Sequence, residues 1–314
     1  MPEVEILCGS GDYDIQAMMK KSNIILLVSA LVVAVLTAAS INLFPGKAGA
    51  VESASTDFLS LGWKRFRMAE YSTAEKEFER ARLAAKPGSK EMTKALYGLS
   101  IVNWLRTPDS NKPKAKEIFE RIIKEDPADD LAVWSKLALV RMRHVVPVGE
   151  TPDYPALCVD YEKLFAAHPD HPAGMEAFAY AQEVRLISFK PEDAQAAVAA
   201  LRGFLDKNPD PRFACWAWEL LSRAHKILGD GDEQLKDKLM LLKTKEMDPT
   251  NPRMNNSFLF WEIATLAQFE VGDLATAKEY YLKFRNEYPR DMRNFAVRRA
   301  LEKIEKIENG EEGL

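Results

Sequence analysis

Apolar residues recur at helical spacing along most of this chain, in pairs of segments separated by a turn. In the clearest example Ala277, Tyr281 and Phe284 lie at i, i+4 and i+7, on one face of a helix. Gly272, which precedes this helix, suits the left-handed residue that ends an earlier one. Pro289 ends the second helix because proline has no N–H to donate. These residues predict a helix–turn–helix unit.

Prolines that close such patterns recur at nearly constant spacing, with gaps of 40, 42, 40, 40 and 40 residues. Counting back twelve, eight and five positions from four of them reaches the same apolar stripe. The stripe is shifted by one residue in the first unit and by two in the fifth. The prolines are Pro87, Pro127, Pro169, Pro209, Pro249 and Pro289. A period held over six units predicts a helical repeat protein.

The order Trp, Ala-Thr, Gly, Ala, Tyr, Phe, Pro in the last unit resembles the tetratricopeptide repeat (TPR), a helix–turn–helix unit of about 34 residues. The departures are Gln268, where that family usually has an aromatic residue, and Ala264 in place of leucine. The resemblance covers about residues 55–289. It implies an all-α, right-handed TPR-like superhelical solenoid of about six helix pairs, without strands. The uncharged run described below adds one N-terminal hydrophobic helix before this solenoid.

Two packing expectations accompany this fold. The paired helices should approach most closely at small residues, namely Ala115, Ala197 and Ala277. A charged amphipathic helix at residues 290–308 should cap the array, because an end repeat must cover its apolar face. Its inner side is predicted to carry Phe295, Ala296, Ala300, Leu301 and Ile304.

The N-terminal part of the chain has a different pattern. Residues 24–44 contain no charged side chain, and 21 residues are long enough to span about 30 Å of hydrocarbon as a helix. Lys20 and Lys21 precede this segment, and Pro45-Gly46 breaks the helix after it. Because positive residues favour the cytoplasmic side, the N-terminus is predicted in the cytoplasm and the repeats across the membrane.

Two outcomes share this segment, and both place the repeats outside the cytoplasm. It is an uncleaved single-pass membrane anchor, or it is a signal peptide that begins at Met18 or Met19 instead of Met1 and is cut near Ala50, leaving a periplasmic or secreted protein. A third reading, a buried helix of a soluble protein, would need a core helix without charges along its whole length. The expected organisation is a leader at 1–22, a transmembrane helix or signal-peptide core at 23–44, a linker at 45–55, repeats at 56–289, a capping helix at 290–308 and a tail at 309–314.

Composition narrows the possible partners. Hydrophobic residues make up 47% of the chain and aromatic residues 10%, which argues against disorder. The net charge of −4 has no basic excess, so a nucleic-acid partner is not expected. Cys158 and Cys215 fall in different repeats and are expected to be unpaired and mostly buried.

The search for catalytic chemistry finds no complete motif. The chain contains no GxSxG, no phosphate-binding glycine loop and no HExxH sequence. His168 and His171 lie close together in a turn, but no cluster of further ligands completes a metal site, so a solvated turn is expected. No catalytic residue, cofactor, metal or small-molecule substrate is therefore predicted.

The TPR resemblance implies a concave groove, lined mainly by the first helix of each pair, that binds a protein or peptide. Placing Trp134, Ala177 and Trp218 at equivalent positions directs three arginines toward this groove, where guanidinium groups could clamp a carboxylate. The predicted groove residues are Trp63, Phe66, Arg143, Phe178, Arg185, Trp216 and Arg223. An acidic or C-terminal partner segment is expected there. The alternative is that the arginines are solvated or pair with neighbouring acids such as Glu183 and Glu219.

Two classes of function remain. The first is a non-catalytic scaffold for protein–protein interaction at a bacterial-type cell envelope, with secretion and envelope assembly as the processes that this layout suggests. The second is a helical-superhelix accessory module of a cell-wall enzyme system. The first is preferred, because enzymes built on a helical superhelix carry a separate catalytic lobe, whereas this chain ends within a helix of its last repeat.

Overall fold

The computed structural model describes residues 54–106, 108–208, 210–247 and 255–311. The predicted leader and hydrophobic helix, residues 1–44, lie outside this part of the chain. No described helix is long and apolar enough to cross a membrane. Within the described ranges the secondary structure is helical, without strands, as predicted.

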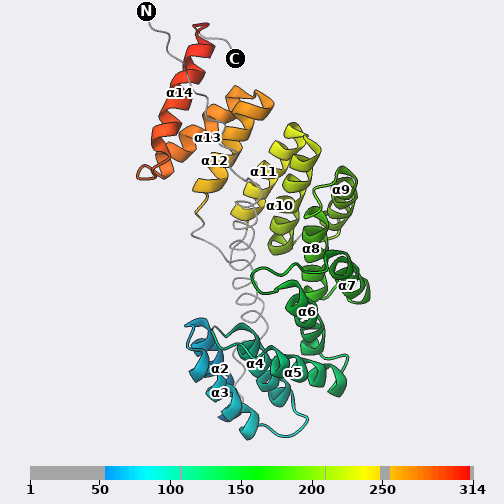
Figure 1. Cartoon of the computed structure of the whole chain (residues 1–314). Helices are drawn as coiled ribbons and strands as arrows, with labels where there is room; N and C mark the ends of the chain where they lie inside the picture. Colours follow the sequence, from blue (N-terminus) through cyan, green and yellow to red (C-terminus); the bar gives the residue numbers. More distant parts are fainter. Residues whose placement is uncertain (1–53, 107, 209, 248–254, 312–314) are drawn as a thin grey trace, which may run out of the picture. The chain divides into compact units, whose positions relative to one another are not determined.

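The helices in the described part of the chain form six pairs followed by one further helix (Figure 1). We call the first member of each pair the A helix and the second the B helix. The pairs are α2 (Ala54–Arg67) and α3 (Tyr71–Ala84), α4 (Lys90–Leu105) and α5 (Lys112–Glu125), α6 (Asp130–His144) and α7 (Tyr154–Ala167), α8 (Pro172–Leu186) and α9 (Pro191–Leu205), α10 (Pro211–Leu228) and α11 (Gly231–Glu246), and α12 (Ser257–Leu266) and α13 (Leu274–Glu287). A π-helical turn, η1 (Ala267–Val271), extends α12, and α14 (Asn294–Glu308) ends the series.

The chain divides into two compact units, residues 1–102 and 103–314. In the first unit α2 packs on α3, and the ring of Phe78 lies between two helix glycines. A Cβ atom at Gly62 or Gly98 would lie 2.7 or 2.5 Å from that ring. Both positions therefore require glycine, because the fully buried ring has no room to move.

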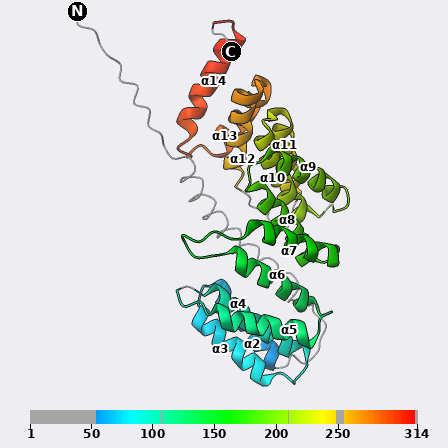
Figure 2. The same ribbon diagram turned by 45° about the vertical axis from the view of Figure 1, so that its right-hand side comes forward.

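In the second unit each helix pair packs on its neighbours in chain order. Both views show α10 and α11 between the pair α8/α9 and the pair α12/α13 (Figure 1, Figure 2). The A helices α6, α8 and α10 are in contact in sequence, α11 contacts α12, and α14 packs on α13. This stacking of one helix pair on the next is the arrangement of a TPR-like helical solenoid.

Local signals set the ends of many helices. Four N-cap side chains accept a hydrogen bond from the backbone N–H three residues later; they are Asn111, Asp153, Asp230 and Asp273. Gly229 and Gly272 adopt the left-handed conformation with φ of 70° and 81°, so the predicted role of Gly272 is confirmed. These caps satisfy backbone groups that the helices themselves leave without partners.

The B-helix stripes form the core, as the periodicity predicts. Phe119, Tyr161, Leu201 and Phe284 are completely shielded from solvent. The predicted close-approach residues are completely buried as well: Ala115, Ala197 and Ala277. Gln268, which stands where the repeat pattern has an aromatic residue, is buried and accepts a hydrogen bond of 2.8 Å from the Tyr281 hydroxyl. A polar side chain is tolerated there because its oxygen has a partner.

The inner side predicted for the capping helix is wrong in part. Phe295 is 66% exposed, and Ala296 is exposed as well. The stripe that packs on α13 instead contains buried Val297 and Ile304, with Ala300 and Leu301 partly buried between them. Phe295 is two residues from Val297, which places it about 200° around the helix and therefore on the opposite face.

Candidate protein-binding face

A ladder of aromatic and cationic side chains connects the A helices α6, α8 and α10 of the second unit and begins at Trp104, in the last turn of α4. The guanidinium carbon of Arg141 on α6 lies 5.7 Å from the ring centre of Trp104 on α4 and 4.9 Å from that of Tyr180 on α8. The Tyr180 ring in turn meets the edge of Trp216 on α10, with 4.9 Å between ring centres. The first three residues are buried and Trp216 is half-buried. These cation–π and edge-to-face contacts hold the A helices side by side.

Two ionisable groups lie buried beside this ladder. Glu176 Oε2 is 4.0 Å from Arg141 Nη1, and burial raises the pKa of Glu176 to about 7 against the opposing charge of Arg141. Nδ1 of His144 lies 3.1 Å from the Tyr161 hydroxyl, and burial together with Arg141 lowers the pKa of His144 to about 4. Neither side chain is open to a partner, so both are part of the interior of the fold.

Ion pairs link α8 to α10 and, through α11, α10 to α12. Arg223 on α10 lies 3.7 Å from Glu183 on α8. Lys238, on the B helix α11, reaches Glu219 on α10 at 3.2 Å and Glu262 on α12 at 3.1 Å. Lys238 is buried, whereas the side chains of Glu219 and Glu262 are 44% and 33% exposed. Charged groups are therefore presented to solvent between α10 and α12.

Two phenylalanines flank this charged group, one on α12 and one on the π-helical turn η1. Phe258 lies four residues before Glu262 on α12, so these two share a face of that helix, and Phe269 lies seven residues after Glu262 on η1. Their exposed fractions are 63% for Phe258 and 69% for Phe269. On α10, half-buried Trp216 lies one turn before Glu219. We call these five residues, Trp216, Glu219, Phe258, Glu262 and Phe269, the α10–α12 surface.

Three aromatic residues of the predicted groove belong to the core instead. In the first unit Trp63 is buried and meets Phe78 edge-on, with ring centres 4.9 Å apart, and Phe66 is buried beside it at 5.8 Å. In the second unit Phe178 is buried and stacks on Phe204 at 4.5 Å. Each ring contacts aromatic side chains of its own unit instead of solvent, so none of the three is available to a partner.

The three predicted arginines already have carboxylate partners within the chain. Arg143 and Arg185 each pair with an acid on the B helix α7, Asp160 and Glu162 respectively. Arg223 pairs with Glu183, as described above. Pairing with neighbouring acids was the alternative that the sequence left open, and the structure shows it for all three. Of the two acids anticipated, Glu183 has this role, while Glu219 contacts Lys238 instead.

The remaining reactive side chains have structural roles. The His171 ring accepts a hydrogen bond from the Ala173 N–H at Nδ1 and lies 2.9 Å from Asp130 at Nε2, so it caps α8 and links neighbouring repeats. The described residues contain no group of three or more histidine, cysteine or acidic side chains able to hold a metal ion. Cys158 and Cys215 form no disulfide and are half-buried, less shielded than predicted.

Three further tryptophans on the A helices pack against the core. Trp134 is buried, and its ring meets that of His171 edge-on. Trp218 and Trp261 are partly buried and pack against the core. Trp261 approaches both stripe residues of its own B helix, with ring centres 6.0 Å from Tyr281 and 6.3 Å from Phe284.

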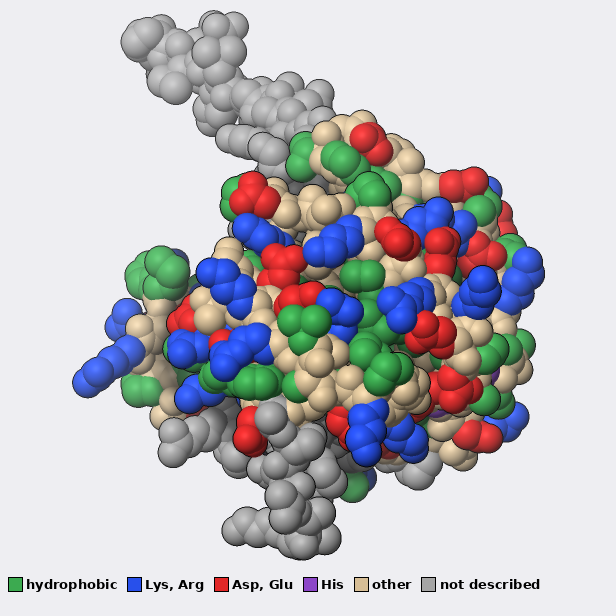
Figure 3. All heavy atoms as spheres, turned by 90° about the horizontal axis from the view of Figure 1, so that it is seen from below, with side chains coloured by type: hydrophobic (Ala, Val, Ile, Leu, Met, Phe, Trp, Pro, Cys, Tyr) green, Lys and Arg blue, Asp and Glu red, His purple; other side chains and the backbone are tan. Residues whose placement is uncertain are grey.

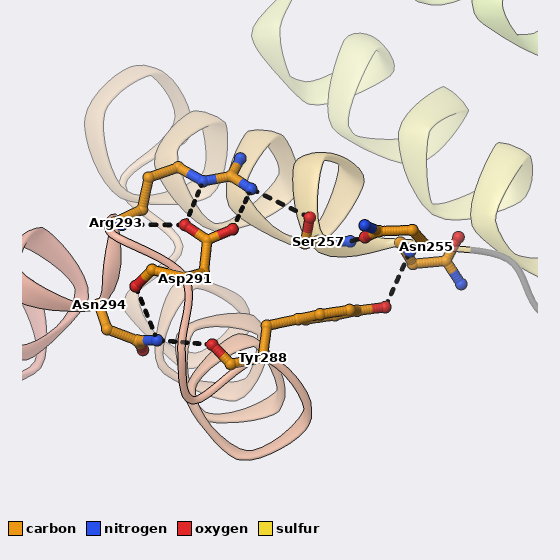
Figure 4. A network of polar contacts seen from close by, with 7 residues as sticks. Asn255, Ser257, Tyr288, Asp291, Arg293 and Asn294 are labelled. Carbon is orange, nitrogen blue, oxygen red and sulfur yellow. Dashed lines mark hydrogen bonds and ion pairs between the residues drawn. The ribbon is translucent and has the colours of Figure 1, made fainter.

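An open cavity of about 350 Å³ lies where α12 begins and α13 ends, lined by Asn255, Ser257, Glu287, Tyr288, Pro289, Arg290 and Asp291. The polar groups around it bond to one another (Figure 4). Arg293 donates to both Asp291 and the Ser257 hydroxyl, and the Tyr288 hydroxyl accepts from the Asn256 N–H. This network fastens the start of α12 to the turn before α14, which makes it a structural joint.

Charges of both signs are interspersed over the face shown in Figure 3, with hydrophobic side chains between them. That face has no large area of a single sign. A partner that binds by long-range attraction to one uniform charge is not indicated by this view.

Comparisons with known proteins identify no family, and the solved structures that are similar to this chain are distant from it. No family model and no curated protein matches the chain. Similar solved structures include a TPR protein from Parabacteroides merdae, with 15% identity, 82% of this chain and 88% of that chain covered, and a TM-score of 0.47. PilF from Pseudomonas aeruginosa has 15% identity, 80% and 96% coverage and a TM-score of 0.48. A thermophilic TPR protein from Thermus thermophilus has 17% identity, 79% and 98% coverage and a TM-score of 0.28.

The class of fold follows from the described helices themselves. Six helix pairs with the predicted B-helix stripes, left-handed glycine turns and a terminal capping helix make this chain a TPR-like helical solenoid. The resemblance inferred from the sequence is confirmed at this level.

Proposed function

We propose that this protein is a non-catalytic scaffold that binds a segment of a partner protein along the A helices of its second unit. The observation that carries the proposal is the α10–α12 surface, where two large phenylalanines stay exposed beside a charged group. Stacked helix pairs of this kind form extended surfaces suited to protein binding. Exposed aromatic residues next to polar ones are typical of the centre and rim of such interfaces.

Site-specific photo-crosslinking tests this proposal. A photoreactive phenylalanine analogue replaces Phe258 or Phe269 in one pair of variants and Phe295, on the capping helix, in a control. The control is matched because its side chain is 66% exposed, against 63% and 69%. We expect a discrete adduct with a partner protein from positions 258 and 269 and none from 295. Adducts from 295 alone would show that the A helices are not the binding face.

We also propose that the repeats act at the cell envelope, outside the cytoplasm. The support is the uncharged run at residues 24–44 with its preceding lysines. A reporter fused after Leu314 that is active only outside the cytoplasm is the expected result, and activity only inside would contradict the charge argument. The mass of the mature protein distinguishes a retained anchor from cleavage near Ala50. Secretion and envelope assembly remain the processes that this layout suggests.

A further inference from the structure

Lys238 faces two carboxylates with a single positive charge. Its Nζ lies 3.2 Å from both carboxylate oxygens of Glu219 and 3.1 Å from Oε2 of Glu262. The lysine side chain is 6% exposed, whereas the glutamates are 44% and 33% exposed. One negative charge therefore remains in this group at neutral pH, and it lies on the members that face solvent.

Two other cations lie near this group, and both are on α10. Arg223 on α10 is directed to Glu183. Lys226, also on α10, acts on Glu262 more weakly than Lys238 does. Burial is the main cause of the raised pKa of Glu262; Lys238 and Lys226 oppose the shift, and Glu219 adds to it.

The apolar part of the α10–α12 surface surrounds the same group. Phe258 on α12 precedes Glu262 by four residues, Phe269 on η1 follows it by seven, and Trp216 lies one turn before Glu219 on α10. Aromatic rings attract a cation through their faces and cover the apolar stem of a long basic side chain. A negative charge between exposed rings is thus complementary to lysine or arginine and unfavourable for a carboxylate.

We propose that the α10–α12 surface binds a lysine or arginine side chain of a partner segment, with apolar residues of that segment on either side. The proposal rests on the scaffold function above and deepens it by giving the chemistry of the partner. It reverses the charge of the partner expected from the sequence, which predicted an acidic segment. The reversal follows from the contacts, because Arg143, Arg185 and Arg223 are each neutralised by an acid of this chain.

The test uses the full chain as bait for a randomised dodecapeptide library displayed on phage. Enriched peptides are then synthesised and their affinity is measured by fluorescence anisotropy. Glu219→Gln removes the excess charge and leaves Lys238 paired with Glu262, so the fold should be unaffected. Glu302→Gln, on the exposed face of α14, is the matched control. Circular dichroism confirms that each variant stays helical, and Glu262→Gln provides an independent second variant.

We expect the enriched peptides to share a lysine or arginine next to apolar residues. Glu219→Gln should weaken their binding about tenfold, the loss typical of one charge-assisted hydrogen bond, whereas Glu302→Gln should have no effect. Phe258→Ala should also weaken binding, and Phe295→Ala should not.

Two results would overturn the proposal while the scaffold function survives. In the first, basic peptides bind Glu219→Gln and Glu262→Gln as tightly as the unmodified chain. In the second, the enriched peptides are acidic and lose affinity in Arg223→Gln. If no enriched peptide depends on Phe258 or Phe269 and neither position forms a photo-adduct, the scaffold function assigned to this face is wrong as well.

Discussion

Gly174 and Gly203 lie in the two helices of one repeat and should respond in opposite ways to alanine. Gly174 is in the first turn of α8, where a Cβ atom would lie 1.9 Å from the carbonyl oxygen of His168. That oxygen belongs to the backbone of the preceding turn and accepts a hydrogen bond from the His171 N–H. Gly203, in α9, has nothing within 4 Å of its Cβ position.

The expected magnitudes follow from this geometry. Alanine stabilises an exposed helix position by up to about 1 kcal/mol relative to glycine, so Gly203→Ala should raise the free energy of unfolding by about that amount. At Gly174 the new atom would have to retreat from 1.9 Å to about 3.3 Å, an ordinary carbon–oxygen contact. Overpacking costs about 3 kcal/mol at its upper range, and the higher helix propensity of alanine offsets about 1 kcal/mol of that cost. We therefore expect Gly174→Ala to destabilise by about 2 kcal/mol.

Urea denaturation followed by far-ultraviolet circular dichroism measures both changes. The two glycines belong to the same compact unit, so their effects should appear in the same transition. The slope of the transition should stay constant, because a change in slope would indicate a change in cooperativity and not in stability alone.

The sign of the change in the free energy of unfolding tests the described packing at each glycine. If Gly174→Ala stabilises the protein as Gly203→Ala does, the turn from α7 to α8 is not packed against α8 as described. If Gly203→Ala destabilises the protein instead, the outer face of α9 is covered in solution.

Three further substitutions test other parts of the fold. Phe189 adopts a left-handed conformation with φ of 55°, so Phe189→Gly should be more stable than Phe189→Ala by about 1 kcal/mol in thermal unfolding; the reverse order would contradict that conformation. Burial raises the pKa of Glu176 from 4.5 to about 7, so its contribution to stability is complete below about pH 4.5 and is lost as the pH rises through about 7. Urea titrations should therefore show that the free energy of unfolding of Glu176→Gln rises relative to that of the unmodified chain as the pH increases, by up to about 3 kcal/mol. Parallel pH profiles of the two proteins would refute this. Ala277→Leu should cost about 1–3 kcal/mol, because Ala277 is completely buried; an unchanged urea midpoint would show that the α12–α13 contact lies elsewhere.

The sequence alone was sufficient for the repeat, its class and its B-helix core. These features follow from local signals. The stripe that ends at Phe284 has helical periodicity, and Gly272 and Pro289 act through the backbone conformation of a single residue. Each repeat carries an apolar stripe and a closing proline, and six imperfect copies strengthen one another. A helix pair needs only its own residues to define which face of its B helix is apolar.

The choice between core and surface on the A helices was not available from the sequence. Trp63, Phe66 and Phe178 are chemically as suited to an interface as to a core, and only the packed neighbours show that they are buried. Likewise, nothing in the local pattern distinguishes exposed Phe258 and Phe269 from them. Aromatic residues serve in both environments, so burial has to be read from the contacts.

Only the tertiary structure decided which charges meet. Tyr180 contacts Trp216, 36 residues further along the chain, whereas Glu219 is linked to Glu262, 43 residues further along. A constant offset between repeats therefore does not predict these contacts, because the connections between A and B helices differ in length. Lys238 lies on a B helix but pairs with Glu219 on an A helix, so an alignment of the A helices alone would not include this contact. An ion pair requires its two groups to lie within about 4 Å, and that distance depends on the rotation and shift of packed helices, which local sequence does not encode.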